Sequence, residues 1–219
     1  MLSQTKYKLL WITIFGIAMG YFEAAVVVYL RKIYSPDMHT LFPLKLLIDN
    51  IMFVELGREF FSLVMLLAVG MLAGRSIKER VAYFFYNFAI WDIFFYIFLK
   101  ITINWPSSFF TWDILFLIPV AWVGPVIAPV IVSITFIIIA LLIIYLEDRQ
   151  IHLHSGINCF ILELIAGTVI VVSFCWDFRN IQSGGMPNPF RWDIFLIGEL
   201  LLVLIFFLYF IKSIACKNN

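Results

Sequence analysis

The sequence predicts an all-α transmembrane fold with about six spanning helices in a single transmembrane domain over residues 1–219. Hydrophobic residues make up 63% and charged residues 13% of the chain, and the mean hydropathy is +1.02. Soluble domains are about 45–50% apolar and about 25% charged, so this composition excludes a soluble domain. The apolar residues also fall into six runs of the length, about 20 residues, that crosses the hydrocarbon core of a bilayer.

The six runs predict helices in chain order. The first run is too long for the apolar region of a cleavable signal peptide, and no small-residue cleavage site follows it, so we expect a spanning helix there. The pairs Gly16/Gly20 and Gly70/Gly74 follow the GxxxG pattern, which predicts close helix packing. The expected helices are residues 9–30, 51–73, 81–100, 113–146, 157–177 and 193–212.

The fourth run is too long for one straight span, because a helix rises about 1.5 Å per residue. It contains Pro119, Pro125 and Pro129. Each proline removes a backbone donor and clashes with the carbonyl four residues earlier. We therefore expect the fourth helix to be kinked or broken near residues 119–129, or to start with a re-entrant half-helix over 113–129. Such breaks occur in membranes only where protein or water satisfies the freed backbone groups.

Two similar segments predict that the helices pair as hairpins. Residues 91–118 and 176–197 each begin with Trp-Asp, pass through a proline-containing loop and continue through Trp-Asp-Ile. We expect helices three and four, and helices five and six, to form two related hairpins with outward-facing tips. Helices one and two form a third hairpin, whose tip contains a possible interfacial helix at 39–50. Asp113 and Asp193 fit as N-caps of the helices that they precede.

The distribution of lysine and arginine predicts the orientation. With the N-terminus inside, the inner segments hold eight of these residues and the outer segments hold six. The clearest positive segment is "RSIKER", between the second and third helices. The sequence therefore predicts a multi-pass protein of the cytoplasmic (inner) membrane with both termini inside.

Four of the expected helices place ionisable residues at nearly the same depth, about 6–12 Å from their outer ends at 1.5 Å per residue. A charge at the centre of a bilayer costs at least about 2.5–3.5 kcal/mol on insertion scales. Groups at one level can pair, share a proton or bind a cation. The candidate residues of this polar site are Glu23, Glu55, Arg58, Glu59, Asp92 and Glu199.

The polar site carries more acids than bases. Glu55, Arg58 and Glu59 share one helix face, because they are spaced i, i+3 and i+4. One guanidinium against five carboxyl groups leaves an excess of four negative charges if all are ionised. Protons on several acids, a bound cation or entering water would each compensate this excess, and each points to a cavity open toward the outer face. The alternative is a structural network that fixes helix packing. Glu163 lies deeper and alone.

Three classes of function remain open. The first is transport or relay of a proton, a cation or a small solute. The second is an accessory or assembly subunit of a larger membrane complex, and the third is a membrane enzyme that acts on a lipid or isoprenoid. No H-E-x-x-H, G-x-S-x-G or phosphate-binding glycine motif is present in the sequence, so catalytic residues, cofactor and metal stay unidentified. Carboxylates without histidine suit Mg²⁺, Ca²⁺ or a proton. The expected partners are the lipid bilayer and other membrane subunits. A net charge of +1 gives no basic patch for nucleic acid.

Several motifs carry a resemblance to a known family. They are "GYFEAAVVVYLR", "ELGRE", "WDIFFYIFLK", "WPSSFFTWDILFLIPVAWVGPV" and "GGMPNPF". With these motifs the chain resembles, over nearly its whole length, a family of uncharacterised bacterial polytopic inner-membrane proteins with no assigned activity. The resemblance implies location and fold only. A weaker likeness to the small membrane lycopene cyclases rests on Trp-Asp pairs and intramembrane glutamates; their paired-glutamate motif is represented here by Glu199 alone.

Overall fold

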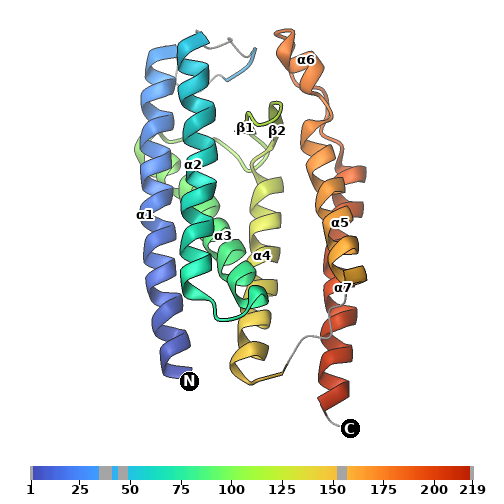
Figure 1. Cartoon of the computed structure of the whole chain (residues 1–219). Helices are drawn as coiled ribbons and strands as arrows, with labels where there is room; N and C mark the ends of the chain where they lie inside the picture. The colour runs from blue at the N-terminus through green and yellow to red at the C-terminus, as the bar shows by residue number, and fades with distance from the viewer. Residues whose placement is uncertain (1, 35–40, 44–48, 152–156, 218–219) are drawn as a thin grey trace.

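The protein is a bundle of long helices that run side by side (Figure 1). The computed structural model describes residues 2–34, 41–43, 49–151 and 157–217. Within these residues, six helices are long and apolar enough to span a membrane, which confirms the predicted all-α transmembrane class. They are α1 (Leu2–Tyr34), α2 (Asp49–Ala73), α3 (Ile77–Ile103), α4 (Ile127–Asp148), α5 (Ile157–Cys175) and α7 (Trp192–Lys217).

The helices follow the predicted order of three hairpins. The start of α1 and the end of α7 lie at the same end of the bundle, which we call the terminal end (Figure 1). Helices α1, α3 and α5 run to the opposite end, which we call the hairpin end, and the connections from them to α2, α4 and α7 start there (Figure 1). The last of these connections contains the short helix α6 (Phe178–Gln182).

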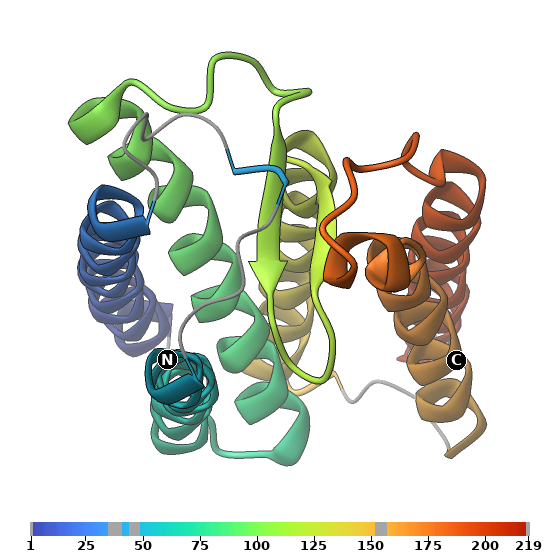
Figure 2. The ribbon, with the colours of Figure 1, turned by 90° about the horizontal axis from the view of Figure 1, so that it is seen from above.

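Helix α3 lies at the centre of one half of the bundle, where α1, α2 and α4 pack against it, while α5 pairs with α7 (Figure 2). Glycine permits two of these contacts. A Cβ atom on Gly20 of α1 would lie 3.0 Å from the backbone N of Phe95, and one on Gly70 of α2 would lie 2.8 Å from the backbone N of Phe84. The close packing predicted from the GxxxG pairs is therefore confirmed.

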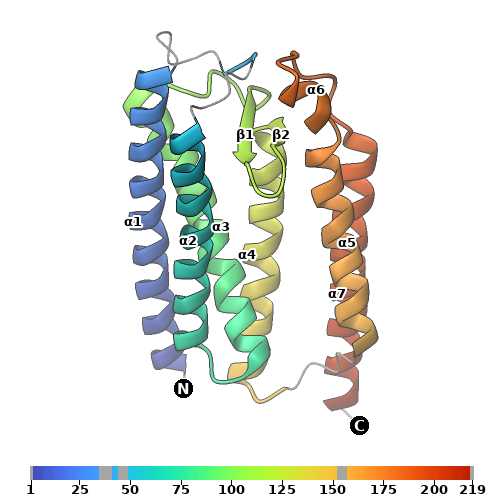
Figure 3. The same cartoon turned by 45° about the horizontal axis from the view of Figure 1, so that its top comes forward.

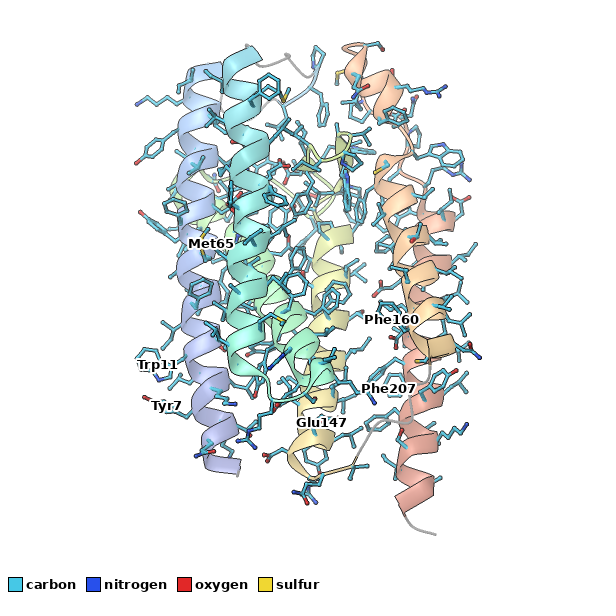
Figure 4. All side chains as sticks on the ribbon, viewed as in Figure 1. Tyr7, Trp11, Met65, Glu147, Phe160 and Phe207 are labelled. Carbon is cyan, nitrogen blue, oxygen red and sulfur yellow. The ribbon has the colours of Figure 1, made fainter. Side chains whose placement is uncertain are left out.

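The outer faces of the helices suit a lipid environment. Tyr7 and Trp11 point outward from the lower part of α1 (Figure 4), and they are 62% and 54% exposed. Aromatic rings of this kind are enriched where a helix meets the membrane–water interface. Their position near the terminal end is that of an aromatic belt.

The predicted helix over 113–146 is wrong in its first part. Residues 112–125 form an antiparallel β-hairpin with strands β1 (Trp112–Phe116) and β2 (Trp122–Pro125), and α4 begins only at Ile127. Pro119 and Pro125 have no N–H to give to a helix, and the aromatic and β-branched residues around them favour extended strands. Pro129 lies in the first turn of α4, where a missing N–H is tolerated.

The hairpin occupies space that the shortened α4 leaves open. Helix α4 begins deeper in the bundle than its neighbours, and the hairpin lies across the bundle beside its start (Figures 1 and 3). A Cβ atom on Gly124 would lie 2.9 Å from Cδ1 of Phe174, so β2 lies directly against α5. The expected break in the fourth run is therefore present, but as a β-hairpin instead of a kink or a half-helix.

The two Trp-Asp segments do not take the same structure. Trp91 is 6% exposed in the middle of α3, whereas Trp176 is 57% exposed just after the end of α5. Asp113 lies within β1 and Asp193 is the second residue of α7, so neither is the helix N-cap that was predicted. The expectation of two related hairpins thus fails at the residue level. The possible interfacial helix at 39–50 lies largely outside the described residues.

The fold predicts which loops share one side of the membrane. In a protein whose own cysteines are replaced by alanine, Ser108→Cys and Ser183→Cys should react with a membrane-impermeant maleimide from the same side of intact vesicles. Gln150→Cys should react only from the other side. All three positions are exposed. Labelling of Ser108→Cys and Ser183→Cys from opposite sides would contradict the three-hairpin arrangement.

Candidate functional site

Arg58 links α2 to α1 through two carboxylates. Its Nε donates to Glu55 Oε2 at 2.9 Å, and its two terminal nitrogens contact Glu55 Oε1 and Glu23 Oε1. The side chain of Arg58 is 16% exposed, and those of Glu23 and Glu55 are 7% and 9% exposed. The second oxygen of Glu23 accepts a hydrogen bond of 3.4 Å from the Ser62 hydroxyl. Arg58 and Glu55 of α2 therefore form a buried ion-pair cluster with Glu23 of α1.

Glu59, one residue further along α2, binds the β-hairpin instead of Arg58. The backbone N–H of Leu117, which directly follows β1, donates to Glu59 Oε2 at 2.9 Å and lies 3.2 Å from Oε1. Glu55, Glu59 and Ser62 recur every three to four residues, so they form one polar stripe on an otherwise apolar helix. This stripe faces α1 at one edge and the hairpin at the other.

Asp92 of α3 is 9% exposed. The hydroxyl of Ser133 on α4 donates to Asp92 Oδ2 at 2.8 Å. Because aspartate and hydroxyl come from neighbouring helices, this hydrogen bond fixes how α3 and α4 meet near the hairpin.

The side chains of Glu23, Glu59 and Asp92 converge on one small cavity, which we call the acidic cavity. Its walls come from α1, α2, α3 and β1, and the acids share them with Phe and Trp rings. The space open to the centres of water molecules is about 30 Å³, and one water needs about 10–15 Å³ on this measure. The cavity therefore has room for one or two waters. It is lined by Glu23, Glu59, Ser62, Trp91, Asp92, Phe95, Tyr96, Leu115 and Phe116.

The acidic cavity has more carboxyl groups around it than positively charged groups. Four carboxyl groups, those of Glu23, Glu55, Glu59 and Asp92, lie in or beside it with the single guanidinium of Arg58. Three acids therefore remain uncompensated if all are ionised. No lysine or arginine lines the cavity among the residues that the structure describes.

Glu199 does not join the other predicted site residues. It is 6% exposed on α7, and its Oε1 accepts a hydrogen bond from the Thr135 hydroxyl of α4. Ser133 and Thr135 project from different faces of α4, one toward Asp92 and the other toward Glu199, so α4 separates Glu199 from the cavity. The depth count grouped Glu199 with the cavity residues because depth along a helix does not determine the direction in which a side chain points.

Sequence reasoning missed a second buried ion pair at the base of the hairpin. Arg31 near the end of α1 lies 3.5 Å from Asp113 of β1, and both side chains are about 5% exposed. The Tyr96 hydroxyl donates to Asp113 at 3.0 Å, and the Arg31 guanidinium lies 3.7 Å from the centre of the Trp105 ring. Burial raises the pKa of the Asp113 carboxyl, while Arg31 and Tyr96 act in the opposite direction.

A signal for Arg31 is present in the sequence. Arg31 follows Glu23 by eight residues, two i+4 steps, so both lie near one face of a helix. The expected first helix ended at residue 30, which assigned Arg31 to a loop, whereas α1 continues to Tyr34.

The remaining candidates lie away from the cavity. Glu163 on α5 lies beside Cys159, whose Sγ is 3.6 Å from Glu163 Oε1. The loop that follows α6 is organised by Asp177, which accepts hydrogen bonds from the backbone and side chain of Asn188. In the described part of the chain, no three His, Cys, Asp or Glu side chains are placed to hold a metal ion together.

No protein-family model, curated protein or solved structure matches this chain.

The ion-pair geometry predicts which double substitution restores stability. Arg58→Met leaves Glu23 and Glu55 without their cation, and breaking a buried pair costs about 3–5 kcal/mol. Adding Glu23→Gln should restore more thermal stability than adding Glu59→Gln, because Arg58 contacts Glu23 whereas Leu117 holds Glu59. Thermal unfolding of the purified variants measures the difference. Equal recovery by the two double variants would contradict this assignment of partners.

Proposed function

We propose that this multi-pass membrane protein takes up a proton or a small cation in the acidic cavity and passes it on, as a transporter or relay. The observation that carries the proposal is the excess of carboxyl groups around one small buried space. Ionisable groups inside a membrane protein are expensive, and they typically mark ion or proton pathways. A proton or a cation supplies the positive charge that the described side chains do not.

The way in which the acids are held supports this proposal. A backbone N–H holds Glu59 and a hydroxyl holds Asp92. Such neutral donors orient a carboxyl group without cancelling its charge. Glu59 and Asp92 therefore keep their capacity to bind a proton or a cation, whereas Glu23 and Glu55 are already paired with Arg58.

The size of the cavity favours a small species. Space for one or two waters accommodates a proton carried on water, or a cation that has lost most of its hydration shell. A lipid or isoprenoid substrate needs a far larger apolar pocket, since small-molecule sites typically measure about 300–1,000 Å³. Among the three classes that the sequence left open, the first is therefore the best supported.

We propose the cytoplasmic membrane as the location, with both termini inside. The support is the excess of lysine and arginine on the segments at the terminal end, eight against six, because such residues are retained on the cytoplasmic side. The acidic cavity, which involves the hairpin and α2, then lies in the half of the bundle nearer the outer face.

Ion flux into vesicles tests the proposed function. The purified protein is reconstituted into liposomes, an inside-negative potential is imposed with potassium and valinomycin, and trapped dyes report H⁺ and Na⁺. The wild-type protein should admit one of these ions faster than protein-free vesicles. Glu59→Gln and Asp92→Asn should reduce the flux to the protein-free level, because each keeps a hydrogen-bond acceptor but removes the ionisable group.

Glu199→Gln is the matched control for this experiment. Glu199 is as buried as the cavity acids and is held by a hydroxyl, yet it lies on the far side of α4. The control should keep the wild-type flux. Absence of flux in the wild type, or unchanged flux in both cavity variants, would contradict the proposal and leave a subunit whose charges hold helices together.

A further inference from the structure

A row of buried polar side chains leads from the acidic cavity along α3 toward the terminal end. Glu79, Tyr83, Asn87 and Trp91 follow one another at i+4 spacing, and they are 6%, 0%, 0% and 6% exposed. Side chains four residues apart on a helix are neighbours, with Cβ atoms about 5–6 Å apart. We call this row the α3 polar row.

Three members of the row lack protein partners. The Tyr83 hydroxyl, both amide atoms of Asn87 and the Trp91 indole N–H have no hydrogen-bond partner among the described residues. Leaving such groups unsatisfied in an apolar interior is energetically unfavourable, so buried polar groups are nearly always paired with protein or water. Bridging waters are the usual partners where protein atoms do not serve.

Asn87 packs against Gly16 of α1, which has no side chain. A Cβ atom on Gly16 would lie 2.9 Å from Asn87 Oδ1, so the glycine leaves room for that amide between α1 and α3. By contrast, the nearby hydroxyls of Thr13 and Tyr86 form a hydrogen bond with each other, and their oxygens are 2.8 Å apart. Buried polar atoms without a partner also lie elsewhere among the described residues, but in the row they belong to three successive side chains at i+4 spacing.

The row joins two acidic regions. At the end of the row that is nearer the hairpin end of the bundle, Trp91 lines the acidic cavity. At the end of the row that is nearer the terminal end, Glu79 accepts a hydrogen bond of 2.6 Å from the backbone N–H of Arg75. The adjacent Ser76 hydroxyl donates to Glu147 at 3.0 Å, and Glu147 lies at the lower end of α4 (Figure 4).

We propose that the transported species is the proton, and that it moves between the acidic cavity and Glu79 along waters held by the α3 polar row. This inference rests on the proposed function and adds the ion and its route. The 13 residues from Glu79 to Asp92 span about 20 Å at 1.5 Å per residue, so the row covers the part of the bundle that the cavity does not reach.

The chemistry of the row suits protons better than metal cations. Each water takes a proton from one neighbour and gives one of its own to the next, so one O–H bond forms and one breaks at every water. One carboxyl group loses a proton, the carboxylate at the far end gains one, and no other group is produced or consumed. The Tyr83 hydroxyl can accept and donate within such a chain, while the Asn87 amide and the Trp91 N–H orient the waters. Na⁺ would need several oxygen ligands at each step, and the row offers one or two.

Proton flux in the reconstituted vesicles tests the route. Tyr83→Phe and Asn87→Leu should reduce H⁺ flux to the level of Glu59→Gln, because each removes the groups that hold water. Tyr86→Phe is the matched control: its hydroxyl pairs with Thr13 outside the row, and it should keep the wild-type flux. Thermal unfolding of each variant checks that the loss of flux is not a loss of folding.

The outcomes separate the route from the function. If the wild type conducts H⁺ and Glu59→Gln does not, but Tyr83→Phe and Asn87→Leu conduct like the wild type, the route is overturned and the proposed function stands. If the wild type conducts only Na⁺, the choice of ion is overturned; if it conducts neither, the proposed function fails as well. Should a variant fail to fold, a high-resolution experimental map decides: ordered water at Asn87 and Tyr83 supports the route, and a dry row overturns it.

Discussion

The hydrogen bond from the Leu117 backbone to Glu59 is the contact on which the rest of the site depends. It fixes a β-hairpin inside a bundle of apolar helices, where non-helical backbone is tolerated only if protein or water satisfies its polar groups. Glu59 supplies that partner at one end of β1, and Arg31 and Tyr96 hold Asp113 near the other end. Two carboxylates thus anchor the strand that closes the acidic cavity.

The same side chains therefore hold neighbouring elements together and line the acidic cavity. Glu59 and Asp92 hold the hairpin and α4 in place, and they also line the space where charge is uncompensated. A change in the charge of Glu59, by uptake or loss of a proton, alters the strength of its bond to Leu117, since hydrogen bonds to ionised acceptors are roughly twice as strong as neutral ones. The contact between the hairpin and α2 therefore depends on the charge of Glu59.

The sequence predicted the helices well because hydropathy and length define a span almost without reference to tertiary structure. It failed in the first part of the predicted helix 113–146, because a short apolar run cannot be assigned to strand or helix by periodicity alone. Proline signalled a break there but not its shape. The site was predicted in part: depth along each helix grouped Glu23, Glu59 and Asp92 correctly. The same measure wrongly grouped Glu199 with these three residues, because packing determines which way each side chain of a helix points. Asp113 was predicted as a helix N-cap and not as the partner of Arg31, because its contacts depend on a strand that was not predicted.

Infrared spectroscopy of the carboxyl groups during a pH titration tests the central claim most directly, namely that Glu23, Glu59 and Asp92 share one cavity and one excess of charge. Acids that interact closely titrate as a group. We therefore expect Asp92→Asn to change the pH at which the remaining carboxyl groups ionise, and Glu199→Gln to remove its own signal and leave the others as they were. If Asp92→Asn and Glu59→Gln each remove one signal and leave every other titration unchanged, the three acids are independent and the shared acidic cavity is contradicted.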